Sequence, residues 1–333
     1  MGLYREGPSR FFATYGYMTG LVLRCVGNLC HVRLEESGQE CDALVKGNLR
    51  LKGIRSTNPV VVGDRVQLIP TSDAEVPFYI TGIIPRRNYI IRKASNLSKE
   101  SHILAANIDV ALLVVTLMRP ETSFTFVDRF LATAEAYDIP VVLLFNKIDL
   151  YGDEEEELFR KWQAIYEPLD YPLARISATE RIGLEQIQAY VAGRTALLSG
   201  HSGVGKSSLI NALLPHNHLR TQAVSEAHGT GMHTTTYSTM IPIAPEYGGG
   251  YLIDTPGIKG FGTLEMNESN TAHYFREFFA LSADCRFNNC IHINEPQCAV
   301  LQALNDGRIA PSRYISYLSI LSDEEEGKYR EGE

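Results

Sequence analysis

The sequence predicts three consecutive domains: a small N-terminal β-barrel, a central α/β domain with a mainly parallel sheet, and a helical C-terminal domain. Three observations support this order. Apolar runs of strand length, separated by Gly, Asn, Ser or Pro, fill the first hundred residues. Strand-like and helix-like runs then alternate, which is typical of a parallel sheet covered by helices. Three cysteines and one histidine cluster near the C-terminus.

The composition is that of a globular protein. The 333 residues are 44% hydrophobic and 21% charged, which argues against a disordered chain. No apolar run is long enough to cross a bilayer, and the N-terminus lacks the apolar stretch of a secretory signal. The sequence therefore predicts a cytoplasmic protein with no membrane partner.

The net charge of −8 is unevenly distributed. Residues 1–100 contain 14 Lys and Arg against 9 Asp and Glu, a charge of +5, and the remainder carries −13. Such asymmetry can mark a basic binding surface. A solvated surface without a partner explains the asymmetry equally well, so charge alone does not decide whether the first hundred residues bind a partner.

Five short apolar runs predict the barrel: GLVLRCVG, LCHVRLEE, ECDALVKG, DRVQLIP and FYITGIIP. Five strands in about 75 residues suit an oligonucleotide-binding (OB) barrel, with an SH3-like barrel as the alternative. Residues 18–95 are assigned to this barrel and residues 1–17 to an N-terminal extension. Cys25, Cys30 and Cys41 lie in these runs and are expected to be small buried hydrophobic residues.

The central domain, residues 96–265, alternates strands and helices. Strands are expected in the apolar runs at 108–117, 140–145, 171–178, 194–200 and within 247–257. Helices are expected at 124–137, 154–169, 183–193 and 205–214.

A phosphate-binding loop follows the strand at 194–200. GHSGVGKSS fits G-x-x-x-x-G-K-S, in which backbone N–H groups of a Gly-rich loop and a helix N-terminus surround phosphate oxygens. Lys206 is expected to reach the β- and γ-phosphates, and Ser207 to hold Mg²⁺. The nucleotide-binding residues of this stretch are Gly200, His201, Ser202, Gly203, Val204, Gly205, Lys206, Ser207 and Ser208.

In the base-reading motif FNKID, Asn146 lies 54 residues before Gly200. Asn146, Lys147 and Asp149 follow a buried strand, and the Asp149 carboxylate can accept two hydrogen bonds from guanine that adenine cannot donate. The motif therefore predicts GTP rather than ATP. Ser177 and Ala178, after the next strand, fit the backbone loop that closes over the base.

DTPG lies 48 residues after Lys206, at the end of a predicted strand. Asp254 fits the acid on the Mg²⁺ side of such a site, and Gly257 can donate its N–H to the γ-phosphate. Ile258 then stands where Ras-like proteins carry the Gln that orients water, so another residue or a partner must supply that role.

The segment HGTGMHTTT lies between the phosphate loop and DTPG. A switch segment needs a Thr that closes onto Mg²⁺ when the γ-phosphate is present. Thr234, Thr235 and Thr236 all qualify, and Thr235 is favoured. His233 either orients the attacking water or is an ordinary loop histidine.

These motifs occur once each, but in an unusual order: the base-reading motif precedes the phosphate loop. A sheet is assembled in space, so joining the original chain ends and cutting elsewhere leaves the site unchanged where those ends lie close together. The order predicts a circularly permuted GTPase.

The C-terminal domain, residues 266–333, carries the pattern Cys285-x4-Cys290-x-His292-x5-Cys298. Three thiolates and one imidazole are a complete tetrahedral ligand set, so we expect one structural Zn²⁺ per chain. Buried cysteines without a metal are the alternative. The acidic tail that follows is expected to be disordered.

Taken together, the GLV barrel opening, VVGDRV, NKID, GHSGVGKSS, HTTT, DTPG and the Cys/His spacing resemble the RsgA (YjeQ) family. The resemblance covers about residues 16–313. It implies an OB barrel that contacts ribosomal RNA, a zinc domain that touches the ribosome, and GTP hydrolysis stimulated by the small ribosomal subunit. It also implies that His233 is the catalytic residue.

The predicted function is that of a ribosome-dependent GTPase that assists late maturation of the small subunit and uses hydrolysis of GTP to GDP for its release. Its partners are then the small subunit, its rRNA, GTP and GDP, its cofactors are Zn²⁺ and Mg²⁺ held by Ser207 and Thr235, and a monomer is expected. A GTP-gated RNA-binding factor with incidental hydrolysis is the alternative. A P-loop ATPase or nucleotide kinase is a weaker one, because Asp149 argues against adenine.

Overall fold

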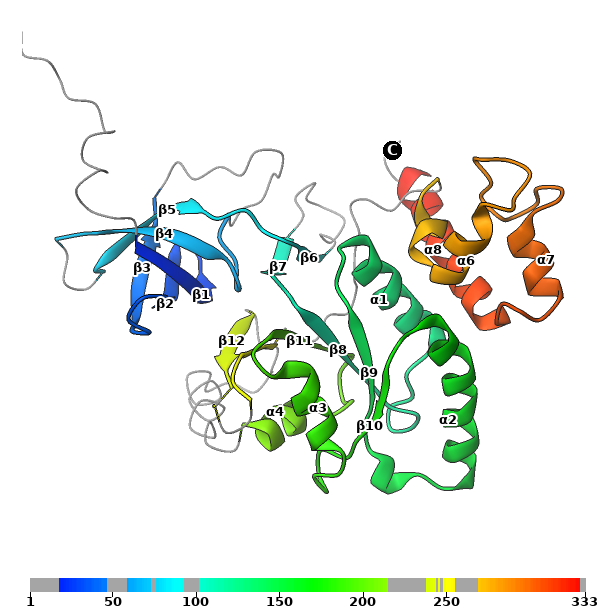
Figure 1. The fold of residues 1–333 in the computed structure, drawn as a ribbon, viewed down its shortest axis with the longest axis horizontal. Coiled ribbons are helices and arrows are strands. Elements are labelled where there is room, and N and C mark those ends of the chain that lie inside the picture. Colours follow the sequence, from blue (N-terminus) through cyan, green and yellow to red (C-terminus); the bar gives the residue numbers. More distant parts are fainter. Residues whose placement is uncertain are drawn as a thin grey trace, which may run out of the picture.

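The computed structural model describes residues 18–46, 59–72, 76–92, 102–214, 238–243, 245, 248–254 and 269–329. Barrel strands, an α/β region and C-terminal helices follow one another along the chain, as the colours of Figure 1 show. The three-part architecture predicted from the sequence is confirmed. The domain boundaries at residues 95 and 265 stay predictions.

Five strands close the N-terminal barrel. Their chain order around the barrel is β1-β2-β3-β5-β4, and β4 returns to pair with β1. Only β3 and β5 are parallel. This Greek-key closure is that of an OB barrel. The strands are β1 Met18–Val26, β2 Leu29–Leu34, β3 Glu40–Val45, β4 Arg65–Pro70 and β5 Phe78–Ile83.

The expectation that Cys25 and Cys30 are separate buried residues is wrong. Cys25 on β1 pairs with Cys30 on β2, with 4.1 Å between their Cα atoms, and the two sulfurs form a disulfide. The sequence spacing gave no warning, because only the register of the hairpin places the two side chains opposite each other. Cys41 is a half-buried free thiol.

The central sheet has the order β10-β9-β8-β11-β13-β12 and is parallel except for β12. Helices cover it, so strands such as β8 are buried on both faces. The predicted strands and helices are confirmed. They are β8 Val110–Val115, β9 Val141–Phe145, β10 Leu173–Arg175, β11 Thr195–Ser199 and β13 Tyr251–Asp254, with α1 Phe124–Ala136, α2 Asp153–Tyr166, α3 Leu184–Val191 and α4 Lys206–Leu213. Two short 3-10 helices are η2 Ile148–Leu150 and η3 Glu167–Leu169.

Three strands were not predicted. β6 (Tyr89–Arg92) and β7 (His102–Ala106) form a separate antiparallel pair, which lies between the barrel and α1 in Figure 1. β12 (Thr239–Pro242) pairs antiparallel with β13 and, at Arg24, with barrel strand β1. Through this contact the barrel and the central sheet are continuous.

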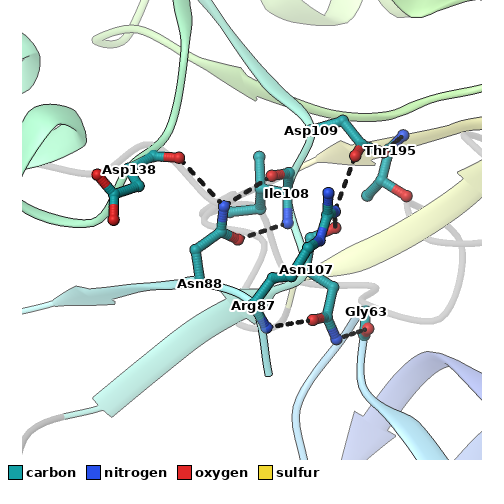
Figure 2. Close-up of polar contacts among 8 residues, drawn as sticks. All are labelled: Gly63, Arg87, Asn88, Asn107, Ile108, Asp109, Asp138 and Thr195. Atoms are coloured by element: carbon teal, nitrogen blue, oxygen red, sulfur yellow. Dashed lines mark hydrogen bonds and ion pairs between the residues drawn. The ribbon is translucent and has the colours of Figure 1, made fainter. Parts of the chain in front are cut away.

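Polar contacts also join the barrel to the central domain, as Figure 2 shows. Asn107 donates its amide N–H to Gly63 O of the barrel at 2.9 Å. Arg87 donates to the carboxylate of Asp109 at 2.8 Å, and the second oxygen of Asp109 accepts the Thr195 N–H that begins β11. The junction therefore lies at the amino ends of β8 and β11.

The C-terminal module, defined here as residues 269–329, contains η6 Thr271–Tyr274, α6 Arg276–Ser282, α7 Ala299–Asn305 and α8 Pro311–Tyr329. The expectation of a disordered acidic tail is wrong up to Tyr329, because α8 continues through 323–326. Acidic side chains do not stop a helix that is already anchored by the packing of its first turns. Within the described residues, no helix combines the length and apolar character needed to cross a bilayer.

Candidate nucleotide-binding site and metal centre

The predicted nucleotide-binding motifs meet at the carboxyl ends of the parallel strands. The phosphate loop follows β11, the NKID motif follows β9, and Asp254 ends β13 between β11 and β12. Open α/β sheets bind ligands at this edge. Sequence segments more than 100 residues apart (Asn146 and Asp254) thus border one site.

Glycines allow the phosphate loop to turn tightly before α4. Gly205 precedes the first residue of α4 and has a φ of 98°, in the left-handed region. A Cβ atom at Gly205 would lie 2.4 Å from Asn146 Nδ2. The loop therefore needs glycine here both for its backbone conformation and for its approach to the NKID motif.

Lys206 lies at the start of α4 and folds back over the loop. Its ammonium donates to Gly200 O at 2.6 Å and to His201 O at 2.8 Å. Desolvation lowers the pKa of Lys206, and Asp254 opposes this shift. Desolvation also raises the pKa of Asp254 to about 6, opposed by Lys206. A cation and a carboxylate thus face each other in a partly buried site, which suits a phosphate with its metal ion.

Asn146 connects three loops of the site. It is 2% exposed. Its amide nitrogen donates to Val204 O of the phosphate loop at 2.8 Å, and its oxygen accepts the Ala178 N–H at 3.0 Å. The predicted base loop and phosphate loop are therefore held against the same side chain.

Lys147 adds a second bridge. Its backbone is left-handed, with a φ of 69°. Its ammonium donates to Gly203 O at 2.9 Å and also to Arg119 O in the loop after β8. Sequence reasoning did not single out this loop, since it carries no nucleotide-binding motif.

The remaining predicted residues divide into exposed, buried and undescribed ones. Asp149 lies in η2 with its side chain exposed, and Ser202, Ser207 and Ser208 are exposed around the phosphate loop. Ser177 is fully buried, and its hydroxyl accepts the Glu180 N–H at 3.1 Å, which shapes the base loop. His233, Thr235 and Gly257 lie outside the described residues.

Cys285, Cys290, His292 and Cys298 come together in the C-terminal module. Their ligand atoms all lie within 4.8 Å of one another. His292 Nδ1 is 3.3 Å from Cys298 Sγ, and the sulfurs of Cys285 and Cys298 are 3.9 Å apart. Sulfurs bound about 2.3 Å from a tetrahedral metal are about 3.8 Å apart. The chemistry and spacing of the four donors therefore fit a metal ion.

Surrounding residues hold the loop that carries His292. The Glu295 carboxylate accepts the N–H groups of Ile291 at 2.8 Å and Ile293 at 2.9 Å, and Tyr314 donates its hydroxyl to His292 O at 2.8 Å. Such supporting contacts orient metal ligands. Glu295 was missed by sequence reasoning, although its position inside the Cys/His pattern was a signal.

Comparisons with known proteins agree with this geometry. A family model described as RsgA GTPase matches residues 83–264. The small ribosomal subunit biogenesis GTPase RsgA of Porphyromonas gingivalis is 58% identical over 313 residues, which cover 94% of this chain and 99% of that protein.

Two solved structures are similar over nearly the whole chain. The crystal structure of YjeQ from Thermotoga maritima has a TM-score of 0.72 at 32% identity and covers 92% of this chain and 98% of that one. YloQ, described as a circularly permuted GTPase, has a TM-score of 0.70 at 25% identity and covers 95% and 97%. The fold of this chain is thus similar to that of both structures over more than nine-tenths of its length.

Proposed function

The chain belongs to the RsgA GTPase family, and we propose that it hydrolyses GTP to GDP on the small ribosomal subunit, assists the late maturation of that subunit and uses hydrolysis for its release. The observation that carries the nucleotide part is Asn146, which hydrogen-bonds to the phosphate loop and to the base loop at once. The ribosomal part rests on the small-subunit role in the name of the 58% identical relative. The cytoplasm and a monomer remain our expectation.

In this proposal Asp149 reads guanine, and Ser177 and Ala178 close over the base. Residues 200–208 surround the phosphates, with Lys206 on the β- and γ-phosphates. Mg²⁺ supplies charge neutralisation and is held by Ser207 and Thr235, with Asp254 on its side of the site. His233 acts on the attacking water, a role that rests on the family resemblance, whereas the roles of Thr235 and Gly257 rest on the HTTT and DTPG motifs.

We further propose that the ion of the Cys/His cluster is Zn²⁺. Three sulfurs and one nitrogen are a donor set that zinc prefers, and four protein ligands leave no open position for water. Its role is therefore structural: the ion anchors a short module whose ligands come from loops. As the family resemblance implies, the barrel then contacts rRNA and this module touches the ribosome.

The test is GTP turnover by the full chain, with and without purified small ribosomal subunits. Turnover that rises many-fold only with subunits supports the proposal, and His233→Ala should abolish that rise. Equal turnover with and without subunits contradicts the ribosomal part and favours a GTP-gated binding factor.

Base specificity has its own measurement. Asp149→Asn should weaken GDP binding by about tenfold or more, because a carboxylate that accepts two hydrogen bonds from guanine is replaced by an amide. The same variant should gain affinity for xanthosine diphosphate, whose ring presents an acceptor to the new amide N–H. Unchanged GDP affinity would contradict the assigned role.

A further inference from the structure

Helix α1 contacts both the phosphate loop and the C-terminal module. It begins after Ser123, whose hydroxyl accepts the Phe126 N–H at 3.2 Å and caps the helix. Phe130 and Leu131 belong to the core of the central domain, whereas Ala132 packs in the core of the C-terminal module. One helix is therefore shared by two cores.

Thr122 ties the start of α1 to the phosphate loop. Its side chain is buried, with 2% of the residue exposed, and its Oγ1 lies 2.8 Å from His201 Nε2. The same oxygen accepts the Thr116 N–H at 3.0 Å, and the Thr122 N–H donates to Thr116 O at 2.8 Å. The two hydrogen bonds with the Thr116 backbone thus fix Thr122, and Thr122 in turn positions the His201 ring.

The partners of His201 define its tautomer. Nδ1 lies 3.2 Å from Ser202 O, a carbonyl that can only accept, so Nδ1 carries the proton in the neutral ring. Nε2 then accepts the Thr122 hydroxyl proton. The Phe126 ring, on the first turn of α1, meets the imidazole edge-on at 5.3 Å between centroids. The His201 carbonyl meanwhile accepts Lys206 Nζ, so this residue supports the phosphate-binding lysine.

A buried ion cluster ties the middle of α1 to the C-terminal module. Arg313 on α8 is 1% exposed and donates to Asp128 on α1 at 2.7 Å. It also donates to Glu277 on α6 at 2.7 and 2.9 Å. Tyr166 donates its hydroxyl to the same Asp128 oxygen at 2.6 Å.

A second contact joins α1 to α8: Arg129 of α1 donates to the Ser319 hydroxyl at 2.8 Å.

From these contacts we infer that Thr122 and His201 are positioning residues of the phosphate loop, and that α1 transmits to them the docking of the C-terminal module through Asp128 and Arg313. The inference rests on the proposed nucleotide site. Packed helices shift as units, so a displacement of α8 moves α1, whose Phe126 ring contacts His201 and whose N-cap Ser123 directly follows Thr122. The consequence is reciprocal coupling: nucleotide binding and module docking stabilise each other.

The nucleotide end is tested with Thr122→Val, which removes the hydroxyl at nearly constant shape. The Kd of the full chain for mant-GDP should rise by roughly five- to tenfold, and the ¹⁵N imidazole signals of His201, identified by their loss in His201→Gln, should shift. Thr122→Ser should restore both. Thr133→Val is the matched control, since Thr133 is a buried threonine of α1, 3% exposed, whose hydroxyl donates to Arg129 O.

The module end is tested with Arg313→Lys, which keeps the charge but loses the forked geometry. The Kd for mant-GDP should rise by roughly three- to thirtyfold, and the rise should be much smaller in the Thr122→Val background. Arg86→Lys is the control, because Arg86 forms a buried pair with Asp64 in the barrel and also donates to Pro59 O. If Arg313→Lys loses the metal ion of the module, Ser319→Ala, a milder change at the same interface, replaces it in the same measurement.

Losses of mant-GDP affinity from Arg313→Lys and Thr122→Val that simply add in the double variant would overturn the inference. So would ¹⁵N signals of His201 that shift in neither Arg313→Lys nor Ser319→Ala. These results are distinct from failure of the proposed function. If the unaltered chain does not bind mant-GDP, the nucleotide site itself is wrong; if it binds and only the coupling is absent, the site stands.

Discussion

At the residue scale, Asn146 does the most to assemble the nucleotide site. One buried amide accepts an N–H from the base loop and donates to the phosphate loop. Because its partners lie 58 and 32 residues away in the sequence, Asn146 fixes the positions of three loops relative to one another.

Replacing this side chain should therefore affect stability and binding together. Asn146→Ala leaves Val204 O and the Ala178 N–H unpaired, which should cost about 2–4 kcal/mol of the free energy of unfolding and raise the Kd for GDP by about tenfold or more. Chemical denaturation and GDP titration measure the two effects. Asn88→Ala is the control, because Asn88 makes two hydrogen bonds with the Ile108 backbone at the opposite end of the sheet. A similar loss of GDP affinity in Asn88→Ala would contradict the role of Asn146.

Asp254 gives the site a pH dependence. Desolvation raises its pKa to about 6 in the free protein, so protonation sets in as the pH falls through 6. If the carboxylate supports Mg²⁺, the gain in GDP affinity on adding Mg²⁺ should fall by about tenfold for each pH unit below 6. GDP titrations with Mg²⁺ and with EDTA between pH 5 and 8 measure this gain. In Asp254→Asn the gain in GDP affinity on adding Mg²⁺ should be small and independent of pH. A steep pH dependence in that variant would mean that another group titrates.

At the scale of elements, the Cys/His loops have little regular structure to fix them. Cys298 precedes α7 and its sulfur accepts the Leu301 N–H, which binds one ligand to the start of a helix. The other three ligands come from the segment between α6 and α7. A metal ion bound by all four residues would hold this segment together beside the hydrogen bonds of Glu295 and Tyr314.

Loss of one ligand should therefore lower both metal content and module stability. Cys298→Ser should release the proposed zinc ion, and its melting temperature should fall to that of the unaltered protein treated with a chelator. Elemental analysis and thermal denaturation check the two statements. Cys41→Ser, at a free thiol of the barrel, should keep the metal and the melting temperature. Zinc retained in Cys298→Ser would refute the four-ligand site.

At the scale of the whole molecule, the three parts of the chain are joined by buried polar contacts rather than by linkers alone. The barrel is held to the central domain by the Ala106 N–H, which donates to Val62 O at 2.9 Å, and these two residues are 0% and 4% exposed. The C-terminal module is held through Arg313 and Asp128. The nucleotide site thus lies in a domain that is anchored on two sides.

The ion pair of Arg86 with Asp64 is buried inside the barrel, and breaking it should be costly. Arg86→Met leaves the Asp64 carboxylate buried without its partner, and should lower the free energy of unfolding by about 3–5 kcal/mol. Arg65→Met, which removes an ion pair with Glu35 whose side chains are 54% and 28% exposed, should cost less than about 1 kcal/mol. Denaturant titration of both variants decides. Equal losses of unfolding free energy in the two variants would mean that the buried pair stabilises the barrel no more than the exposed pair does.

The sequence by itself determined the chemistry of this protein. Its short strand-like runs, alternating elements, NKID and GKSS motifs and Cys/His spacing are local patterns, and each was sufficient to predict an element or a donor set. The reversed motif order was enough to predict the permutation. Such signals are local because hydrogen-bonding capacity, helix periodicity and ligand type belong to the residues themselves.

Only the tertiary structure decided how these parts meet. The pairing of Cys25 with Cys30 depends on hairpin register, and the contact of β12 with β1 depends on the approach of two domains. The contact of Thr122 with His201, and the sharing of α1 between two cores, join residues far apart in the chain. Pairings of this kind are set by the packing of whole elements against one another, and local sequence patterns carry no information on which distant side chain will be the partner.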